Sequence, residues 1–266
     1  MSSLKPASQA PRSVGTTDTG HVRQNNQDAI FCDDELGLWL VADGMGGHAG
    51  GARASEIARD TISARLNNGH GLRDAILEAH RAIRAEQDAC PDFGDMGTTV
   101  VVIFDHGDEY EIGWVGDSRA YRYSADTGKL ELLTRDHNVA GMLVAAGALS
   151  PSEAARHPQR HVLTDCLGLV GEHDPRVGSL QERWQSGEWL LICSDGLTGE
   201  LDDEDIERTL AGSDGLEEAS HALLDKAMNA GAHDNVSLVL VAGPLVDSGA
   251  GRRGSRWPWP FRRRSL

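Results

Sequence analysis

Short apolar runs, paired around turn sequences, are the feature of this chain that most restricts its fold. Two such runs, residues 29–33 and 38–43, flank the turn sequence DELG, and two more, residues 98–104 and 110–115, flank HGD. Paired runs of this length around Gly and Asp are typical of β-hairpins. Further strands are expected at residues 118–123, 129–133, 189–193 and 236–241.

Four longer segments have the 3.6-residue apolar periodicity of amphipathic helices. They are residues 51–66, 72–88, 203–210 and 216–230. Hairpins separated by pairs of long helices favour antiparallel sheets covered by helices over an alternating βαβ fold. The sequence therefore predicts an α+β protein.

Charge divides the chain into an acidic body and a basic tail. The net charge is −16, and residues 248–266 hold six arginines and no acid, which leaves −22 for residues 1–247. The body therefore lacks the basic face that a nucleic-acid-binding protein needs. The tail also holds Trp257, Trp259 and Phe261 but has no helical or strand periodicity, so we expect it to be disordered in isolation.

Three aspartates lie at the edges of expected strands. Asp43 and Asp195 each end an apolar run and precede Gly, and Asp234 comes directly before the last run. Each Asp-Gly pair taken alone reads as an ordinary turn. If the fold brings the three together, the carboxylates repel one another unless cations lie between them, and hard oxygen ligands suit Mg²⁺ or Mn²⁺.

Two rival motifs are weak. Residues 44–49 (GMGGHA) fit the dinucleotide-binding glycine pattern, but no second strand with a terminal acid follows about 20 residues later. Residues 116–120 (GDSRA) are one residue short of a serine-hydrolase nucleophile elbow, and a strand is expected after them where that motif requires a helix. No grouping of Cys and His suggests zinc, and we expect His137, His157 and His161 to lie on the surface or on a flap.

The four cysteines are scattered, which predicts small, buried, unpaired side chains and a reducing, cytoplasmic location. The first residues do not resemble a signal peptide, and no apolar run approaches the ~20 residues of a membrane helix.

Seven short motifs, in order over residues 15–243, resemble the metal-dependent protein serine/threonine phosphatases of type 2C (PPM), in the compact form of the bacterial branch. They are residues 20–28 (GHVRQNNQD), 41–48 (VADGMGGH), 97–99 (GTT), 115–119 (VGDSR), 133–137 (LTRDH), 193–197 (CSDGL) and 233–235 (HDN).

The resemblance implies a four-layer α-β-β-α sandwich, in which two stacked antiparallel sheets are flanked by helices. It divides the chain into a flexible N-terminus (residues 1–14), a phosphatase domain (15–244) and a disordered basic tail (245–266). Within the domain it assigns residues 136–178, approximately, to a flap subdomain beside a metal cleft.

The resemblance also implies the site residues. Asp43 matches the aspartate that bridges two metal ions, and Gly44 matches a ligand through its backbone carbonyl. Asp195 and Asp234 match the other carboxylates of the first ion, and Asp117 matches an acid that can hold a third ion together with Asp195. The remaining two matches are Asp28, to an outer-shell acid acting through water, and Arg23, to the arginine that grips the substrate phosphate.

The implied activity is hydrolysis of phosphoserine and phosphothreonine in proteins by a metal-activated water, opposing a bacterial serine/threonine kinase. Two or three Mn²⁺ or Mg²⁺ ions are the expected cofactors, and a monomer is expected. The tail could adhere weakly to the anionic inner face of a membrane, could rest on the acidic body, or could serve only solubility.

The chain departs from the family pattern twice. Met45 stands where some members have a histidine proposed as the general acid, and Gln27 stands where a glutamate is common. Neither change touches Asp43, Asp195 or Asp234, so we expect an active enzyme. The alternative is a degenerate phosphatase fold that binds metal and partners without turnover.

Overall fold

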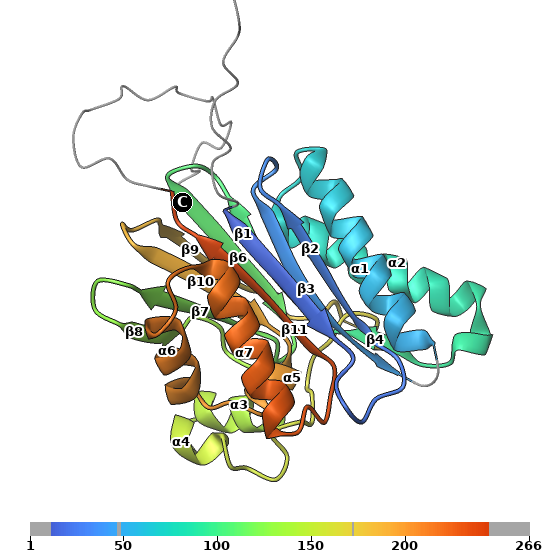
Figure 1. Cartoon of the computed structure of the whole chain (residues 1–266). Helices are drawn as coiled ribbons and strands as arrows, with labels where there is room; N and C mark the ends of the chain where they lie inside the picture. Colours follow the sequence, from blue (N-terminus) through green and yellow to red (C-terminus); the bar gives the residue numbers. More distant parts are fainter. Residues whose placement is uncertain (1–11, 47–48, 172, 245–266) are drawn as a thin grey trace, which may run out of the picture.

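Two antiparallel sheets are stacked face to face, with helices on both outer sides, in the computed structural model, which describes residues 12–46, 49–171 and 173–244 (Figure 1). The first sheet has five strands in the order β1 (Ser13–Asp18), β11 (Val236–Ala242), β10 (Glu188–Cys193), β7 (Arg119–Ser124) and β8 (Lys129–Leu132). The second sheet contains β2 (Asp28–Asp33), β3 (Leu38–Gly46), β5 (Val100–Asp105), β6 (Glu109–Val115) and β9 (Gly178–Arg183), and the short β4 (Met96–Thr98) pairs with the end of β3.

The core between the sheets consists of side chains from alternate strand positions. Along β3, Trp39 and Val41 pack against the facing sheet, whereas Leu38, Leu40 and Ala42 pack against the helices. This two-residue alternation is what a strand with both faces covered requires. The strand reads as a continuous apolar run for the same reason.

The helices form the two outer layers. The helices α1 (Gly50–Asn67) and α2 (Leu72–Ala89) cover the second sheet, and α5 (Asp195–Thr198), α6 (Asp203–Ala211) and α7 (Leu216–Ala230) cover the first (Figure 1). A 3₁₀ turn, η1 (Pro91–Phe93), follows α2. The predicted four-layer sandwich is confirmed, and the four helices predicted from periodicity appear with bounds within one residue.

Three strands were missed by the sequence prediction. β1 begins at Ser13, inside the N-terminal segment (residues 1–14) that was expected to be flexible, and residues 1–11 of that segment lie outside the described residues. β4 has only three residues. β9 is an edge strand of the second sheet with exposed and half-buried positions and no apolar run.

The expected flap segment, residues 136–178, extends from one end of the sandwich. It contains two short helices, α3 (Val139–Ala145) and α4 (Pro151–Ala154), which lie below β7 and β8 in the view of Figure 1. An isolated β-bridge between Asn138 and Leu163 joins the start of the segment to its later part, and Val139 N–H donates to Val162 O at 2.9 Å.

Two further predictions concern the histidines and cysteines. His137, expected at the surface or on a flap, lies at the start of the expected flap segment and is buried there; its ring Nδ1 accepts a hydrogen bond from Gly116 N–H at 3.3 Å. All four cysteines are free thiols; Cys166 and Cys193 are buried, but Cys32 is exposed on β2, contrary to the expected burial. No helix in the described part of the chain is long and apolar enough to cross a bilayer.

Candidate active site

The first pair of predicted site residues is brought together by a hairpin. Asp28 opens β2 and lies directly opposite Asp43 in the β2–β3 register. At the next position, Gly44 has no room for a side chain, because a Cβ there would lie 2.2 Å from Gly51 O and 2.5 Å from Gln27 O. The glycine thus lets the strand end pack against the start of α1.

Thr99 connects the end of β3, at Asp43, to the turn that carries Asp117. Thr99 N–H donates to Asp43 O at 2.9 Å, and the Thr99 hydroxyl lies 2.6 Å from the Ser118 hydroxyl. Gly116 adopts φ +105°, in the region that favours glycine, and packs against Thr99. This turn presents Asp117, which is only 7% exposed, beside the end of β3.

The second pair comes from two adjacent strands of the other sheet. Asp195 follows the end of β10, and Asp234 precedes β11, which pairs with β10. A Cβ on Gly196 would lie 1.9 Å from Asn235 O, so the Asp-Gly turn packs directly on the Asp-Asn segment. The glycines after Asp43 and Asp195 therefore permit close backbone approach, which a turn dipeptide alone would not require.

Arg23 lies on the loop between β1 and β2 and binds Asp234 with both arms of its guanidinium. Its Nε and Nη2 donate to the two carboxylate oxygens at 2.8 and 2.6 Å. Asn235, which the sequence analysis did not single out, holds this loop: its side chain donates to Thr19 O and Asn25 O and accepts from Gln27 N–H. The half-exposed arginine is thus held at the mouth of the aspartate cluster.

The five aspartates act on one another electrostatically. Burial, followed by the charges of Asp28, Asp195, Asp117 and Asp234, raises the pKa of Asp43 well above its usual value. Burial also raises the pKa of Asp28 and of Asp117 to about 7, with Asp195 adding to both shifts.

Asp195 differs from Asp43, Asp28 and Asp117. Its burial favours a raised pKa, but its interactions with the His161 ring and with Asp43 outweigh that effect and hold the pKa below its usual value. The His161 ring Nδ1 lies 3.8 Å from Asp195 Oδ2. His161 was expected only as a surface or flap residue, and spacing along the chain gives no signal of this contact.

The donor set fits hard divalent cations. All five side chains offer carboxylate oxygen, and Asp28 Oδ1 is buried without a hydrogen-bond partner. Within the described residues, however, no three His, Cys, Asp or Glu side chains converge tightly enough to enclose one ion. Arg23 pairs with Asp234, and the His161 ring lies 3.8 Å from Asp195, so two of the five carboxylates face these partners.

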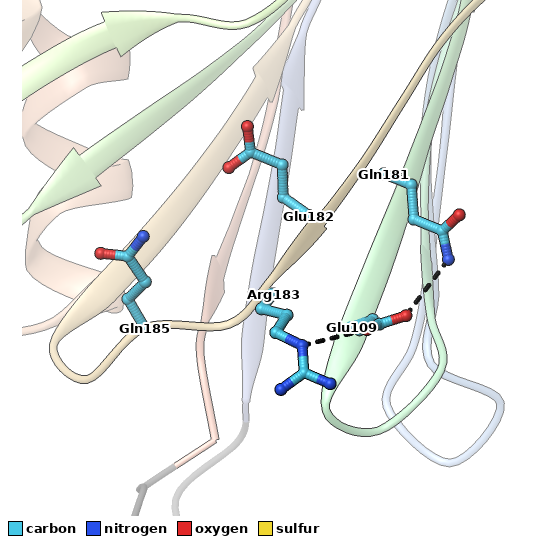
Figure 2. A pocket seen from close by; sticks show the side chains of 5 residues that line it. All are labelled: Glu109, Gln181, Glu182, Arg183 and Gln185. Atoms are coloured by element: carbon cyan, nitrogen blue, oxygen red, sulfur yellow. Dashed lines mark hydrogen bonds and ion pairs between the residues drawn. The ribbon is translucent and has the colours of Figure 1, made fainter.

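A groove of about 810 Å³ opens beside Asp117 and Asp195. It runs between the flap helices on one side and the α5–α6 segment on the other, and Asp117 and Asp195 lie on its lining. A second hollow of about 490 Å³ lies at the β6–β9 edge and contains none of the predicted site residues (Figure 2).

Met45 and Gln27, the two departures from the family pattern, both lie near the aspartate cluster in sequence. Met45 lies on β3 opposite Gly97 of β4 and has no proton to donate. Gln27 precedes Asp28, and its side-chain Oε1 would lie 2.9 Å from a Cβ on Gly51. The rival dinucleotide motif includes residues 47 and 48, which lie outside the described residues. The rival nucleophile elbow is followed by β7, a strand, as expected.

Comparison with known proteins gives consistent results. A model of the family "Protein phosphatase 2C" matches residues 17–235. The serine/threonine phosphatase stp of Listeria welshimeri is 32% identical over 246 residues, which cover 88% of this chain and 96% of that protein.

Solved structures agree in fold. The crystal structure of the Mycobacterium tuberculosis serine/threonine phosphatase PstP/Ppp has a TM-score of 0.79 and 32% identity, covering 87% of this chain and 97% of that one. A structure of the PstP catalytic domain in complex with 2 manganese ions has a TM-score of 0.75 and 31% identity, with the same coverage.

Proposed function

The chain belongs to the protein phosphatase 2C family and is a metal-dependent serine/threonine protein phosphatase; on that premise we propose that its clustered aspartates hold the metal ions. Asp43 would bridge two Mn²⁺ or Mg²⁺ ions, with Gly44 O, Asp195 and Asp234 as further ligands. Asp117 and Asp195 would hold a third ion, and Asp28 would act through water. The observation that carries this assignment is the convergence of five aspartates from both sheets on one end of the sandwich.

When bound, divalent cations offset phosphoryl charge and acidify a water for attack on phosphorus. The protein's own residues have separate tasks. The strand ends hold the carboxylates rigidly, since each aspartate borders a buried strand or lies in a hydrogen-bonded turn. The groove beside Asp117 and Asp195 would accept the peptide chain around the phosphorylated residue.

Arg23 would bind the substrate phosphate. Its planar fork, now paired with both oxygens of Asp234, has the geometry that matches two phosphoryl oxygens. If Asp234 serves as a metal ligand, the Arg23 guanidinium would be free to bind the phosphate in its place. There Arg23 would counter the charge that develops on the phosphoryl group.

Removal of the metal should abolish turnover. We expect phosphate release from a phosphothreonine peptide in Mn²⁺ and its loss in excess EDTA, with recovery when Mn²⁺ is restored. A phosphotyrosine peptide of the same sequence is the matched control, and we expect it to be a poor substrate. Equal turnover in EDTA would contradict a metal-dependent mechanism, and binding of Mn²⁺ without any turnover would favour a binding module.

The finer assignments are also proposals. We propose the division into a phosphatase domain up to residue 244, with its flap at residues 136–178, and a basic tail at 245–266. The tail lies outside the described residues. We further propose a cytoplasmic monomer that reverses the action of a serine/threonine kinase.

The tail provides a separate prediction about membrane contact. Six arginines near an anionic surface contribute on the order of 1 kcal/mol each, and tryptophans favour the interface. We expect the full chain to sediment with phosphatidylserine vesicles at low salt, and a chain ending at Val246 to remain in the supernatant. Equal sedimentation of the two chains would remove the membrane proposal.

A further inference from the structure

Ser194 lies between the end of β10 and α5, directly before Asp195, and it is fully buried. It is the N-cap residue of α5, a position where a serine hydroxyl commonly accepts a hydrogen bond from the first turn of the helix. The Ser194 hydroxyl makes no such bond. Capping of α5 therefore does not explain this side chain, and its partners lie elsewhere.

The first partner of the hydroxyl is the neighbouring strand β11. Ser194 N–H donates to Ser237 O at 3.0 Å, which continues the ladder between β10 and β11 by one residue. The return bond goes to the side chain, because Ser237 N–H donates to Ser194 Oγ, also at 3.0 Å. The hydroxyl oxygen thus accepts on the side of β11, and its single proton remains for another partner.

The second partner belongs to the other sheet. Ser194 Oγ lies 3.0 Å from Oδ2 of Asp28, which opens β2. The competing acceptor, Ser237 O, is farther away at 3.5 Å and already accepts the bond from Ser194 N–H. The hydroxyl therefore donates to Asp28, and this bond joins the two sheets within the aspartate cluster.

The bond leaves the two carboxylate oxygens of Asp28 in different surroundings. Ser194 holds Oδ2, whereas Oδ1 is buried and accepts no hydrogen bond from any group in the described part of the chain. Buried polar atoms rarely lack a partner. An oxygen held in one orientation, on the residue directly opposite Asp43, is suited to accept a hydrogen bond from a water bound to a divalent cation.

We propose that Ser194 is a positioning residue, which fixes the Asp28 carboxylate through Oδ2 and so keeps Oδ1 available to a metal-bound water. This inference rests on the proposed function, in which Asp28 acts on a metal ion through water. Outer partners that orient the groups around a metal commonly change its affinity by about 10- to 100-fold.

A double-mutant cycle separates this role from a structural one. Ser194→Ala removes the donor to Asp28 but also the acceptor for Ser237 N–H, so the single variant cannot distinguish the two. If Ser194 acts through Asp28, its loss has no further effect once Asp28→Ala has removed the carboxylate. Damage to the β10–β11 ladder would weaken metal binding in both backgrounds, because Asp195 and Asp234 border those strands.

Two further variants complete the set. Ser220→Ala is the matched control, since Ser220 is equally buried and its hydroxyl lies 2.7 Å from the Thr16 hydroxyl, between α7 and β1. Ser194→Cys keeps the size of the side chain but offers only a weak donor, and it carries the test if Ser194→Ala does not fold. Thermal unfolding in EDTA shows which variants are folded.

The experiment titrates Mn²⁺ into the full chain of each variant and measures free Mn²⁺ by electron paramagnetic resonance. Asp28→Ala identifies which part of the binding curve depends on Asp28. This readout does not depend on turnover.

We expect Ser194→Ala and Ser194→Cys to weaken the Asp28-dependent part about tenfold, and Ser220→Ala to match the wild type. In the Asp28→Ala background, the loss of Ser194 should change Mn²⁺ affinity by less than about twofold. Wild-type affinity in both Ser194 variants, or the same loss with and without Asp28, would overturn the proposal. Wild-type affinity in Asp28→Ala would overturn it together with the role proposed for Asp28, and a wild type that binds no Mn²⁺ would overturn the proposed metal site itself.

Discussion

Replacing Asp43 by Asn should reduce kcat by roughly a thousandfold, because a bridging carboxylate supports both ions that stabilise the transition state, a contribution of about 4 kcal/mol. The same change should stabilise the EDTA-treated protein. In that form Asp43 is crowded by Asp28, Asp117, Asp195 and Asp234, and a neutral amide removes part of the repulsion. We expect a gain of about 1 kcal/mol, or roughly 2–4 °C in melting temperature.

The EDTA-treated wild type should also lose stability as the pH rises through about 7. The pKa values of Asp28 and Asp117 are raised to about 7 in the folded protein. Between the lower pKa of an aspartate in the unfolded chain and pH 7, the folded state therefore binds more protons than the unfolded state. The contribution of these two carboxyl groups to the free energy of unfolding is therefore present at low pH and lost as the pH rises. Binding of Mn²⁺ should restore the lost stability.

Asp60→Asn is the control for Asp43→Asn, because Asp60 is an exposed carboxylate on α1 that pairs with Arg59. Phosphopeptide turnover and thermal unfolding in EDTA are measured on both variants. A kcat within tenfold of the wild type in Asp43→Asn would contradict the proposed bridging role. A melting temperature in EDTA below that of the wild type would contradict the repulsion between Asp43 and its neighbouring aspartates.

Substitution of Arg23 should have the second-largest effect. Arg23→Lys keeps the positive charge but loses the planar guanidinium, so we expect kcat/KM to fall about 100-fold. Arg23→Ala should lower kcat/KM roughly a thousandfold. Mn²⁺ affinity should not fall in either variant, because Asp234 loses a competing partner. This separates a phosphate-binding role from damage to the metal site.

Arg183→Lys is the matched control for the arginine substitution. Arg183 forms an exposed ion pair with Glu109 in the hollow at the β6–β9 edge, with Nε 3.1 Å from the carboxylate (Figure 2). The measurement is kcat/KM for a phosphothreonine peptide at saturating Mn²⁺. Wild-type kcat/KM in Arg23→Lys, or an equal loss in Arg183→Lys, would show that Arg23 does not grip the phosphate.

The sequence predicted those elements whose burial pattern is regular. The periodicity of α2 and α7 fixed their bounds closely, because one face of each helix packs on a sheet. The sequence did not predict β1 and β9, because neither strand has an apolar run. The sequence of β1 is SVGTTD and that of β9 is GSLQER. Their positions are set by pairing with β11 and β6, which no local pattern can reveal.

The site was predictable to a similar degree. Strand ends identified Asp43, Asp195 and Asp234, but only the resemblance to a family implied that they converge. The structure supplies the physical reason, namely that Gly44 and Gly196 allow backbone segments from distant parts of the chain to touch. The contact of His161 with Asp195 depends on how the flap segment folds back, so spacing along the chain could not identify it.

The most direct test of the metal centre is a calorimetric titration of Mn²⁺ into metal-free wild type and metal-free Asp43→Asn at the same pH. The proposed site predicts at least two ions per wild-type chain, and weakened binding of both in the variant because one carboxylate bridges them. The same number of ions bound with the same affinity by both proteins would contradict it.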